Sequence, residues 1–171
     1  MLHAREGAAG DVVSAIIIST ATPVDAPAIL ALLDRCGLPT AGLVAHLAET
    51  FVAHRNGEVV ESAALEIYAD GALLRSVAAD PRERGAGLGQ RLTEAAITRA
   101  EARGVSALYL LTTTAERFFP RFGFQKINRT DVPSTVQEST EFKSTCPTSA
   151  IVMRKRLGTS APGDHHPATL A

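Results

Sequence analysis

The stretch from residue 73 to residue 92, LLRSVAADPRERGAGLGQRL, limits the fold more than any other part of the chain. Its first residues form an apolar run of strand length, which Pro81 ends because proline cannot donate to a central ladder. Gly85, Gly87 and Gly89 follow within a basic turn, and helix formers continue the chain. We therefore predict a strand, a tight glycine-rich turn and a helix in direct succession.

The glycine-rich turn is suited to binding an anion. Glycine lets the backbone approach a ligand closely, and the start of a helix offers unpaired N–H groups and a positive dipole end. These features favour a phosphate or a pyrophosphate. The spacing Gly85-x-Gly87-x-Gly89 is not the G-x-G-x-x-G of dinucleotide sites, and the sequence contains no nucleoside triphosphate P-loop. The turn alone leaves open a glycine-rich connection without a ligand.

Composition excludes several classes of protein. A length of 171 residues predicts one domain with a sizeable core, and a net charge of −1 argues against a nucleic-acid partner. No apolar run has the length of a membrane span, and the first residues lack the order of a signal peptide. Cys36 and Cys146 do not make a disulfide framework, and no metal-binding motif is present. We therefore expect a cytoplasmic protein with no membrane or nucleic-acid partner and no metal.

Hydrophobic patterns predict one domain of strands and helices over residues 14–157. We expect strands at 14–20, 51–55, 58–68, 72–79, 105–111, 124–127 and 150–157, helices at 26–36 and 88–103, and short helices near 43–47, 115–119 and 133–139. The pair Asn56-Gly57 predicts a hairpin. Residues 1–13 and 158–171 carry no such pattern, and we expect both segments to be disordered.

Two motifs resemble those of a known family. The pattern Arg84-x-x-Gly87-x-Gly89 resembles the acetyl-CoA loop of GNAT acetyltransferases. Residues 114–124, ending in Gly123-Phe124, resemble the GNAT segment in which a short helix packs beside the CoA thiol arm. The order of the expected elements is also similar to the GNAT order. The resemblance implies an α/β (α+β) fold, with a mixed, mostly antiparallel, twisted sheet flanked by helices. Acetyl-CoA would lie in a V-shaped gap between two central strands.

A finer resemblance lies in several phrases of the sequence. LLRSVA, LYLLTTTAERFF, RFGF, EF-x-x-x-CP and SAIVM resemble phrases of the GNAT enzymes encoded in bacterial arsenic-resistance operons. That subfamily is linked to N-acetylation of small amines or amino acids, arsenic-containing ones included. The resemblance implies an acetyl-CoA-dependent N-acetyltransferase for the primary amine of an amino acid or an analogue, by direct attack on the thioester.

The resemblance also implies where the cofactor binds. The expected CoA contacts come from the end of the strand, the glycine loop and the short aromatic helix, namely Val77, Ala79, Arg82, Arg84, Gly85, Gly87, Leu88, Gly89 and Phe119. The Val77 amide would be the catalytic donor to the oxyanion. Phe119 stands where many GNAT enzymes have a tyrosine acid. The sequence therefore leaves open whether a hydroxyl of residues 112–114 or a water protonates the thiolate, or whether the thiolate leaves unassisted.

The acceptor side is expected on the strands around this gap. Glu66 is the candidate base, acting through a water, with an exposed strand carboxylate as the alternative. Arg75 is the candidate clamp for the acceptor's carboxylate, since an arginine within an apolar strand needs an anionic partner. Its alternative is a salt bridge with Glu66 or Glu61. Ser76 and Thr112 complete the expected substrate-binding residues.

Other functions stay open at this level. A protein or peptide N-acetyltransferase is the alternative enzyme, although the sequence shows no acidic cluster for a basic peptide. The missing tyrosine at Phe119 also allows a non-catalytic acyl-CoA-binding sensor. A homodimer is left open, and the last strand is expected to offer an edge for it.

Overall fold

The computed structural model describes residues 15–145 and 147–158. The strands are β1 (Ile16–Thr20), β2 (Thr50–Arg55), β3 (Glu58–Tyr68), β4 (Gly71–Ala79), β5 (Ala107–Thr112), β6 (Gln125–Ile127) and β7 (Ile151–Arg156). The helices are α1 (Ala26–Arg35), α2 (Leu88–Ala102) and α3 (Ser134–Gln137). The predictions for residues 1–13, for Cys146 and for all but the first residue of the 158–171 tail concern residues outside the described ranges.

The strands form one sheet in the order β1-β2-β3-β4-β5-β7-β6. The first four strands pair antiparallel in sequence order. Asn56 and Gly57 make the predicted hairpin turn between β2 and β3 with φ of 52° and 78°. β4 and β5 are parallel because the chain crosses over through α2 between them. The predicted GNAT fold, with a mixed and mostly antiparallel sheet, is therefore confirmed.

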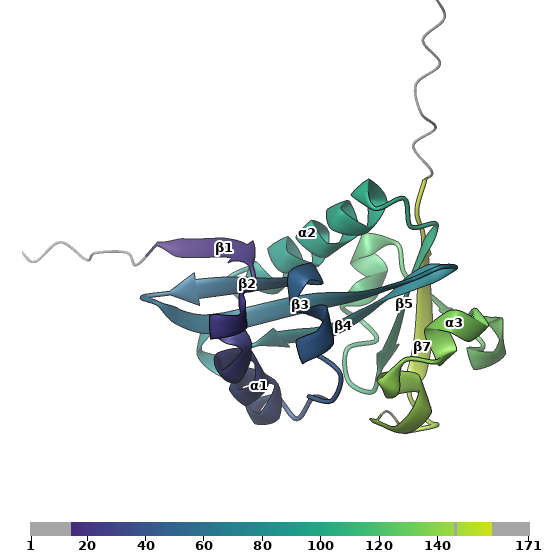
Figure 1. Cartoon of the computed structure of the whole chain (residues 1–171), viewed down its shortest axis with the longest axis horizontal. Coiled ribbons are helices and arrows are strands. Elements are labelled where there is room, and N and C mark those ends of the chain that lie inside the picture. The colour runs from purple at the N-terminus through teal and green to yellow at the C-terminus, as the bar shows by residue number, and fades with distance from the viewer. Residues whose placement is uncertain (1–14, 146, 159–171) are drawn as a thin grey trace, which may run out of the picture.

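Helices cover both faces of the sheet. Figure 1 shows α1 on one face and α2 on the other. Ile29, Leu32 and Leu33 give α1 an apolar stripe that is completely buried. The buried side of α2 carries Leu88, Leu92, Thr93, Ala96, Ile97 and Ala100. A third, smaller cluster joins α3 to the β4–β5–β7 part of the sheet. The central strands are thus held from both sides.

A bulge interrupts β4 where the sheet has to open. Ala64 of β3 faces Arg75, whereas Ser62 faces Ala78, so β4 contains one residue more than β3. The extra length is taken up at Ser76, which has a left-handed φ of 55°. The Ser62 hydroxyl donates to the Ser76 carbonyl at 2.7 Å, which fixes the distorted turn.

The gap between the two central strands begins just before this bulge. β4 and β5 pair only at Ala72 with Leu108 and at Leu73 with Tyr109. Beyond these pairs, residues 74–77 of β4 and 110–112 of β5 line a common cavity. The strands therefore meet at one end and separate at the other, as the V-shaped gap requires.

Three details differ from the prediction. β7 lies between β5 and β6, so the last strand is not an edge, and the expectation of an edge there was wrong. The short helices expected near residues 43–47 and 115–119 are 3-10 helices at Val44–Glu49 and, later than predicted, at Phe119–Phe122, the short aromatic helix. A π-helical turn at Glu141–Thr145 was not predicted, since the polar residues around it show no apolar period. Among the described residues, no helix is both long and apolar enough to cross a membrane.

Candidate active site

The glycine loop begins at Asp80, directly after β4. Its carboxylate accepts a hydrogen bond from the Arg82 amide at 3.0 Å and so caps the 3-10 turn Pro81–Glu83. Gly87 then takes the N-cap position of α2 with a left-handed φ of 77°. Gly85 is also left-handed, with a φ of 89°. A Cβ on either glycine would meet nothing within 4 Å, so this side of the loop is open.

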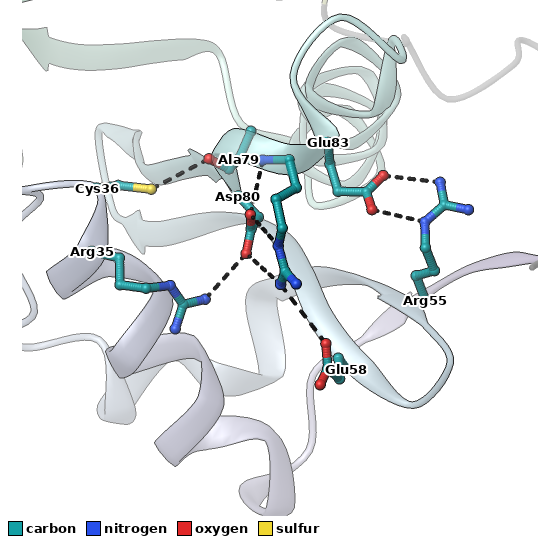
Figure 2. Close-up of polar contacts among 8 residues, drawn as sticks. Arg35, Cys36, Arg55, Glu58, Ala79, Asp80 and Glu83 are labelled. Atoms are coloured by element: carbon teal, nitrogen blue, oxygen red, sulfur yellow. Dashed lines mark hydrogen bonds and ion pairs between the residues drawn. The ribbon is translucent and has the colours of Figure 1, made fainter.

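Ion pairs hold the loop in place, as Figure 2 shows. Asp80 Oδ1 and Oδ2 each accept from the Arg82 guanidinium at 3.1 Å, and Arg35 of α1 lies 3.5 Å from Oδ2. The hydrogen bonds from Arg82 lower the pKa of Asp80 to about 2. Glu83 accepts two hydrogen bonds from Arg55 of β2, at 2.8 and 2.9 Å. The loop is thus tied to α1 through Arg35 and to β2 through Arg55.

A cavity of about 600 Å³ lies beside the loop. Of the expected cofactor contacts, all but Arg82 line it: Val77, Ala79, Arg84, Gly85, Gly87, Leu88, Gly89 and Phe119. Arg82 instead extends over Asp80 and reaches Glu58 at 3.8 Å, with 72% of its side chain exposed. Arg82, although predicted as a cofactor contact, is therefore not among the residues that line this cavity. The wall also contains residues that were not predicted, including Glu61, Phe118 and Arg121.

A smaller cavity of about 190 Å³ fills the gap between β4 and β5. Leu38, Val77, Thr114, Ala115 and Phe119 line both cavities, which therefore meet at the bulge and at the short aromatic helix. Ser76 and Thr112, both predicted on the substrate side, line the smaller cavity. The Thr112 hydroxyl oxygen accepts from the Ala115 amide at 2.9 Å and orders the turn after β5.

Arg75 is the charged centre of the smaller cavity, and its side chain is fully buried. Its Nη1 donates to Glu66 Oε1 at 2.7 Å, and its Nε lies 3.3 Å from Glu141 Oε1. Nη2 donates to the Pro39 carbonyl at 3.2 Å, and Nε also donates to the Ser76 hydroxyl at 3.1 Å. The alternative of a salt bridge with Glu66 is therefore confirmed. An incoming carboxylate would have to share or replace one of these partners.

Glu66 lies behind Arg75, away from the cavities. It is 2% exposed and is found in neither of the two cavity walls. Its second oxygen accepts from the Tyr68 hydroxyl, and His46 Nε2 lies 3.8 Å from the first. Burial and the hydrogen bond to Glu66 raise the pKa of Tyr68, so this hydroxyl stays a donor. Glu66 is thus not the exposed strand carboxylate of the alternative, and its position suits holding Arg75.

Glu141 is a buried residue of the smaller cavity that the sequence reasoning missed. It lies in the π-helical turn Glu141–Thr145, is 4% exposed, and lines the smaller cavity. Burial raises its pKa to about 7, although Arg75 acts in the opposite direction. The phrase EF-x-x-x-CP contains this residue, but a single glutamate in a Ser/Thr-rich segment carries no periodic signal of its position.

Comparison with known proteins agrees with this geometry. The family model described as the acetyltransferase (GNAT) domain matches residues 46–126, which include β4, the glycine loop and α2. Residues 46–126 thus match a GNAT acetyltransferase domain, and the sheet around them has the GNAT fold. N-acetylglutamate synthase from Neisseria gonorrhoeae, complexed with coenzyme A and N-acetyl-glutamate, superposes with a TM-score of 0.72 and 26% identity, over 85% of this chain and 36% of that one.

Two further relatives of the GNAT domain are informative. A Mycobacterium tuberculosis protein solved in complex with CoA has a TM-score of 0.70 and 27% identity, over 82% of this chain and 99% of that one. An amino-acid acetyltransferase from Pasteurella multocida is 32% identical over 125 residues, which are 68% of this chain and 28% of the relative. The chain thus spans about a quarter of the length of the curated relatives it matches.

The GNAT domain brings the expected parts together around one opening. The glycine loop and Val77 lie on the larger cavity, and Arg75, Ser76 and Thr112 lie on the smaller one. Within the described residues, no group of three or more His, Cys, Asp or Glu could hold a metal ion. The arrangement offers an anion-binding loop, backbone donors at a bulge and a buried carboxyl with a pKa near neutrality.

Proposed function

We propose that the protein is an acetyl-CoA-dependent N-acetyltransferase for the primary amine of an amino acid or an amino-acid analogue. The observation that carries this proposal is the junction of two unequal cavities at the β4 bulge. The larger cavity has the loop for a pyrophosphate, and the smaller one has room for a small acceptor. The relatives solved with CoA support the assignment of the larger cavity.

The cofactor would be held by backbone groups. The amides from Gly85 to Gly89 suit the pyrophosphate, because they lie at the N-terminus of α2 and the space beside Gly85 and Gly87 is open. The backbone at Val77 and Ala79 would bind the pantetheine arm, since β4 has lost its β5 partner there. The Val77 amide would then donate to the oxyanion of the tetrahedral intermediate.

On the acceptor side we assign the base to Glu141 in place of Glu66. With a pKa of about 7, Glu141 is a carboxylate above neutral pH and takes a proton from the acceptor ammonium. The amine nitrogen attacks the thioester carbon, and the C–S bond breaks as the intermediate collapses. Arg75 would bind the acceptor's carboxylate by sharing donors with Glu141, while Glu66 holds the guanidinium in place.

The thiolate needs no tyrosine to leave. Phe119 has no proton to donate, but thiols are far stronger acids than alcohols, with a pKa of roughly 8.5 for a free cysteine, so a thiolate is a good leaving group. The hydroxyls of Thr112, Thr113 and Thr114 line the same cavity and are available to the departing sulfur. We therefore propose departure as thiolate, which then takes up the second proton that the acceptor nitrogen loses on becoming an amide.

The amino-acid class rests on the relatives. The curated relatives are named amino-acid acetyltransferase, and the Neisseria gonorrhoeae enzyme is complexed with N-acetyl-glutamate, so glutamate comes first among the acceptors to be tested. Amino-acid analogues that carry arsenic belong in the same panel, because of the resemblance to enzymes of arsenic-resistance operons. The cytoplasmic location and the homodimer stay predictions.

The test is release of CoA from acetyl-CoA in the presence of a panel of acceptors. The panel contains free amino acids, arsenical analogues and amines that lack a carboxylate, with basic peptides as the alternative class. We expect turnover on a carboxylate-bearing amine. Arg75→Lys keeps the charge but not the forked geometry, and we expect it to raise the acceptor KM about tenfold or more.

The matched control is Arg156→Ala, which removes an exposed arginine at the end of β7 and should change nothing. Turnover on peptides alone would replace the small-molecule proposal with protein acetylation. Tight binding of acetyl-CoA without turnover on any amine would favour the acyl-CoA sensor.

A further inference from the structure

A buried carboxyl without a role in acetyl transfer lies in the wall of the larger cavity. Glu61 belongs to β3, faces Ala79 of β4 and is 2% exposed. Within the described ranges, its Oε2 is buried and has no hydrogen-bond partner. A Cβ on Gly89 would come within 3.8 Å of this oxygen, so the carboxyl points to the first turn of α2. A buried oxygen without a partner in the wall of a cavity calls for one, and a ligand in that cavity can supply it.

The burial of Glu61 and the carboxylate of Glu83 favour the neutral form of Glu61. Burial raises its pKa to about 7, and the nearby carboxylate of Glu83 adds to the shift. Each element packed against it contributes few free charges. Arg55 of β2 pairs with Glu83, and Asp80 after β4 pairs with Arg82 and Arg35. Cys36 donates to the Ala79 carbonyl, and α2 contributes the neutral Gln90. Arg84 of the loop and Arg121 line the same cavity.

We propose that Glu61 is a cofactor-binding residue whose neutral carboxyl group donates a hydrogen bond to an oxygen of CoA in the larger cavity. The inference rests on the proposed binding of acetyl-CoA there. CoA offers only acceptors at its phosphates, and these carry negative charge. An ionised Glu61 would therefore repel the ligand that its protonated form binds.

The direction of the pH effect on CoA binding follows from the difference between the protonated and the ionised form of Glu61. Below neutral pH the carboxyl is protonated and CoA binds tightly. As the pH rises through about 7, Glu61 must either ionise and weaken binding or take up a proton when CoA binds. Above pH 7 we thus expect proton uptake on binding and a weaker affinity.

The experiment measures the Kd of CoA by calorimetry from about pH 6 to about pH 8, in two buffers with different ionisation enthalpies. For the wild type we expect about a tenfold rise in Kd across this range beyond that of Glu61→Gln. The amide of Glu61→Gln still donates but does not titrate. The phosphates of CoA titrate equally against both proteins, so the difference between them reports Glu61 alone. Proton uptake should be present in the wild type and absent in Glu61→Gln.

Two further variants complete the test. Glu61→Met keeps the length of the side chain without a donor, and we expect weak binding at every pH. Glu101→Gln removes an exposed carboxyl of α2 and should keep the pH dependence of the wild type.

Equal pH profiles for the wild type and Glu61→Gln, or an affinity that rises with pH, would overturn the role of Glu61. Neither result would contradict the proposed function. Absence of CoA binding at every pH would instead overturn the proposed function itself, and this inference with it.

Discussion

The choice between two carboxylates decides the chemistry at the level of single residues. Glu141 lines the acceptor cavity with a pKa near 7, whereas Glu66 is enclosed by Arg75 and Tyr68. For Glu141→Gln we expect kcat/KM to fall about 100-fold or more, the usual scale for loss of a general base. The wild-type rate should rise with pH through about 7, because only the carboxylate accepts a proton. A pH–rate profile of both proteins measures this step.

Glu66→Gln is the matched comparison, since it removes a second buried carboxylate that also contacts Arg75. We expect it to raise the acceptor KM through Arg75 while the step near pH 7 remains. If the step instead persists in Glu141→Gln and disappears in Glu66→Gln, then Glu66 is the base, as the sequence alone indicated.

Individual site residues differ in how well the sequence predicted them. The cavity contacts of Gly85, Gly87 and Gly89 followed from a local motif, because three glycines before a helix leave few other uses. The orientation of Arg82 did not follow, since it depends on an ion pair with Asp80 that no short pattern encodes. Glu141 was missed because its position is set by a π-helical turn that packs against a distant strand.

At the level of elements, the bulge of β4 lies where the two cavities of the candidate site meet. Ser76 holds a left-handed φ of 55°, a conformation that glycine adopts freely and β-branched residues avoid. We expect Ser76→Val to lower the free energy of unfolding by about 1–3 kcal/mol and to weaken CoA binding. Ser76→Gly should stay within about 1 kcal/mol of the wild type, because relief of strain offsets the lost hydrogen bond to Arg75.

Denaturant unfolding of the two variants, followed by CoA titration of each, measures this contrast. Equal stability of Ser76→Val and Ser76→Gly would show that residue 76 is not left-handed in solution. The pair separates backbone strain from side-chain loss, since both variants lack the serine hydroxyl.

The same scale shows what sequence patterns resolve. The elements from β2 to α2 were predicted within a few residues, because their alternation, the Asn56-Gly57 turn and the loop glycines are all local. The place of β7 between β5 and β6 was not predicted, since strand order depends on contacts between residues far apart in the chain. The gap between β4 and β5 was predicted only from the resemblance, because the sequence of β4 has the pattern of an ordinary apolar strand.

For the whole molecule, the two buried carboxyls link stability to pH. Glu61 and Glu141 have their pKa raised from 4.5 to about 7 in the folded protein. Between these values the unfolded chain has already lost protons that the folded protein keeps. The free energy of unfolding therefore falls as the pH rises from about 4.5 to about 7, and at higher pH this contribution stays at its lower value.

The double variant Glu61→Gln/Glu141→Gln removes both titrations, and denaturant unfolding across this pH range tests it. We expect the variant to match the wild type near pH 4.5 and to exceed it above pH 7 by on the order of 1 kcal/mol or more. Glu101→Gln, an exposed site on α2, serves as control and should follow the wild type at every pH. Parallel curves for the wild type and the double variant would mean that both carboxyls ionise freely in the fold. The pH-dependent binding of CoA and the base role of Glu141 would then lose their common physical basis, because each needs a carboxyl that burial keeps neutral until about pH 7.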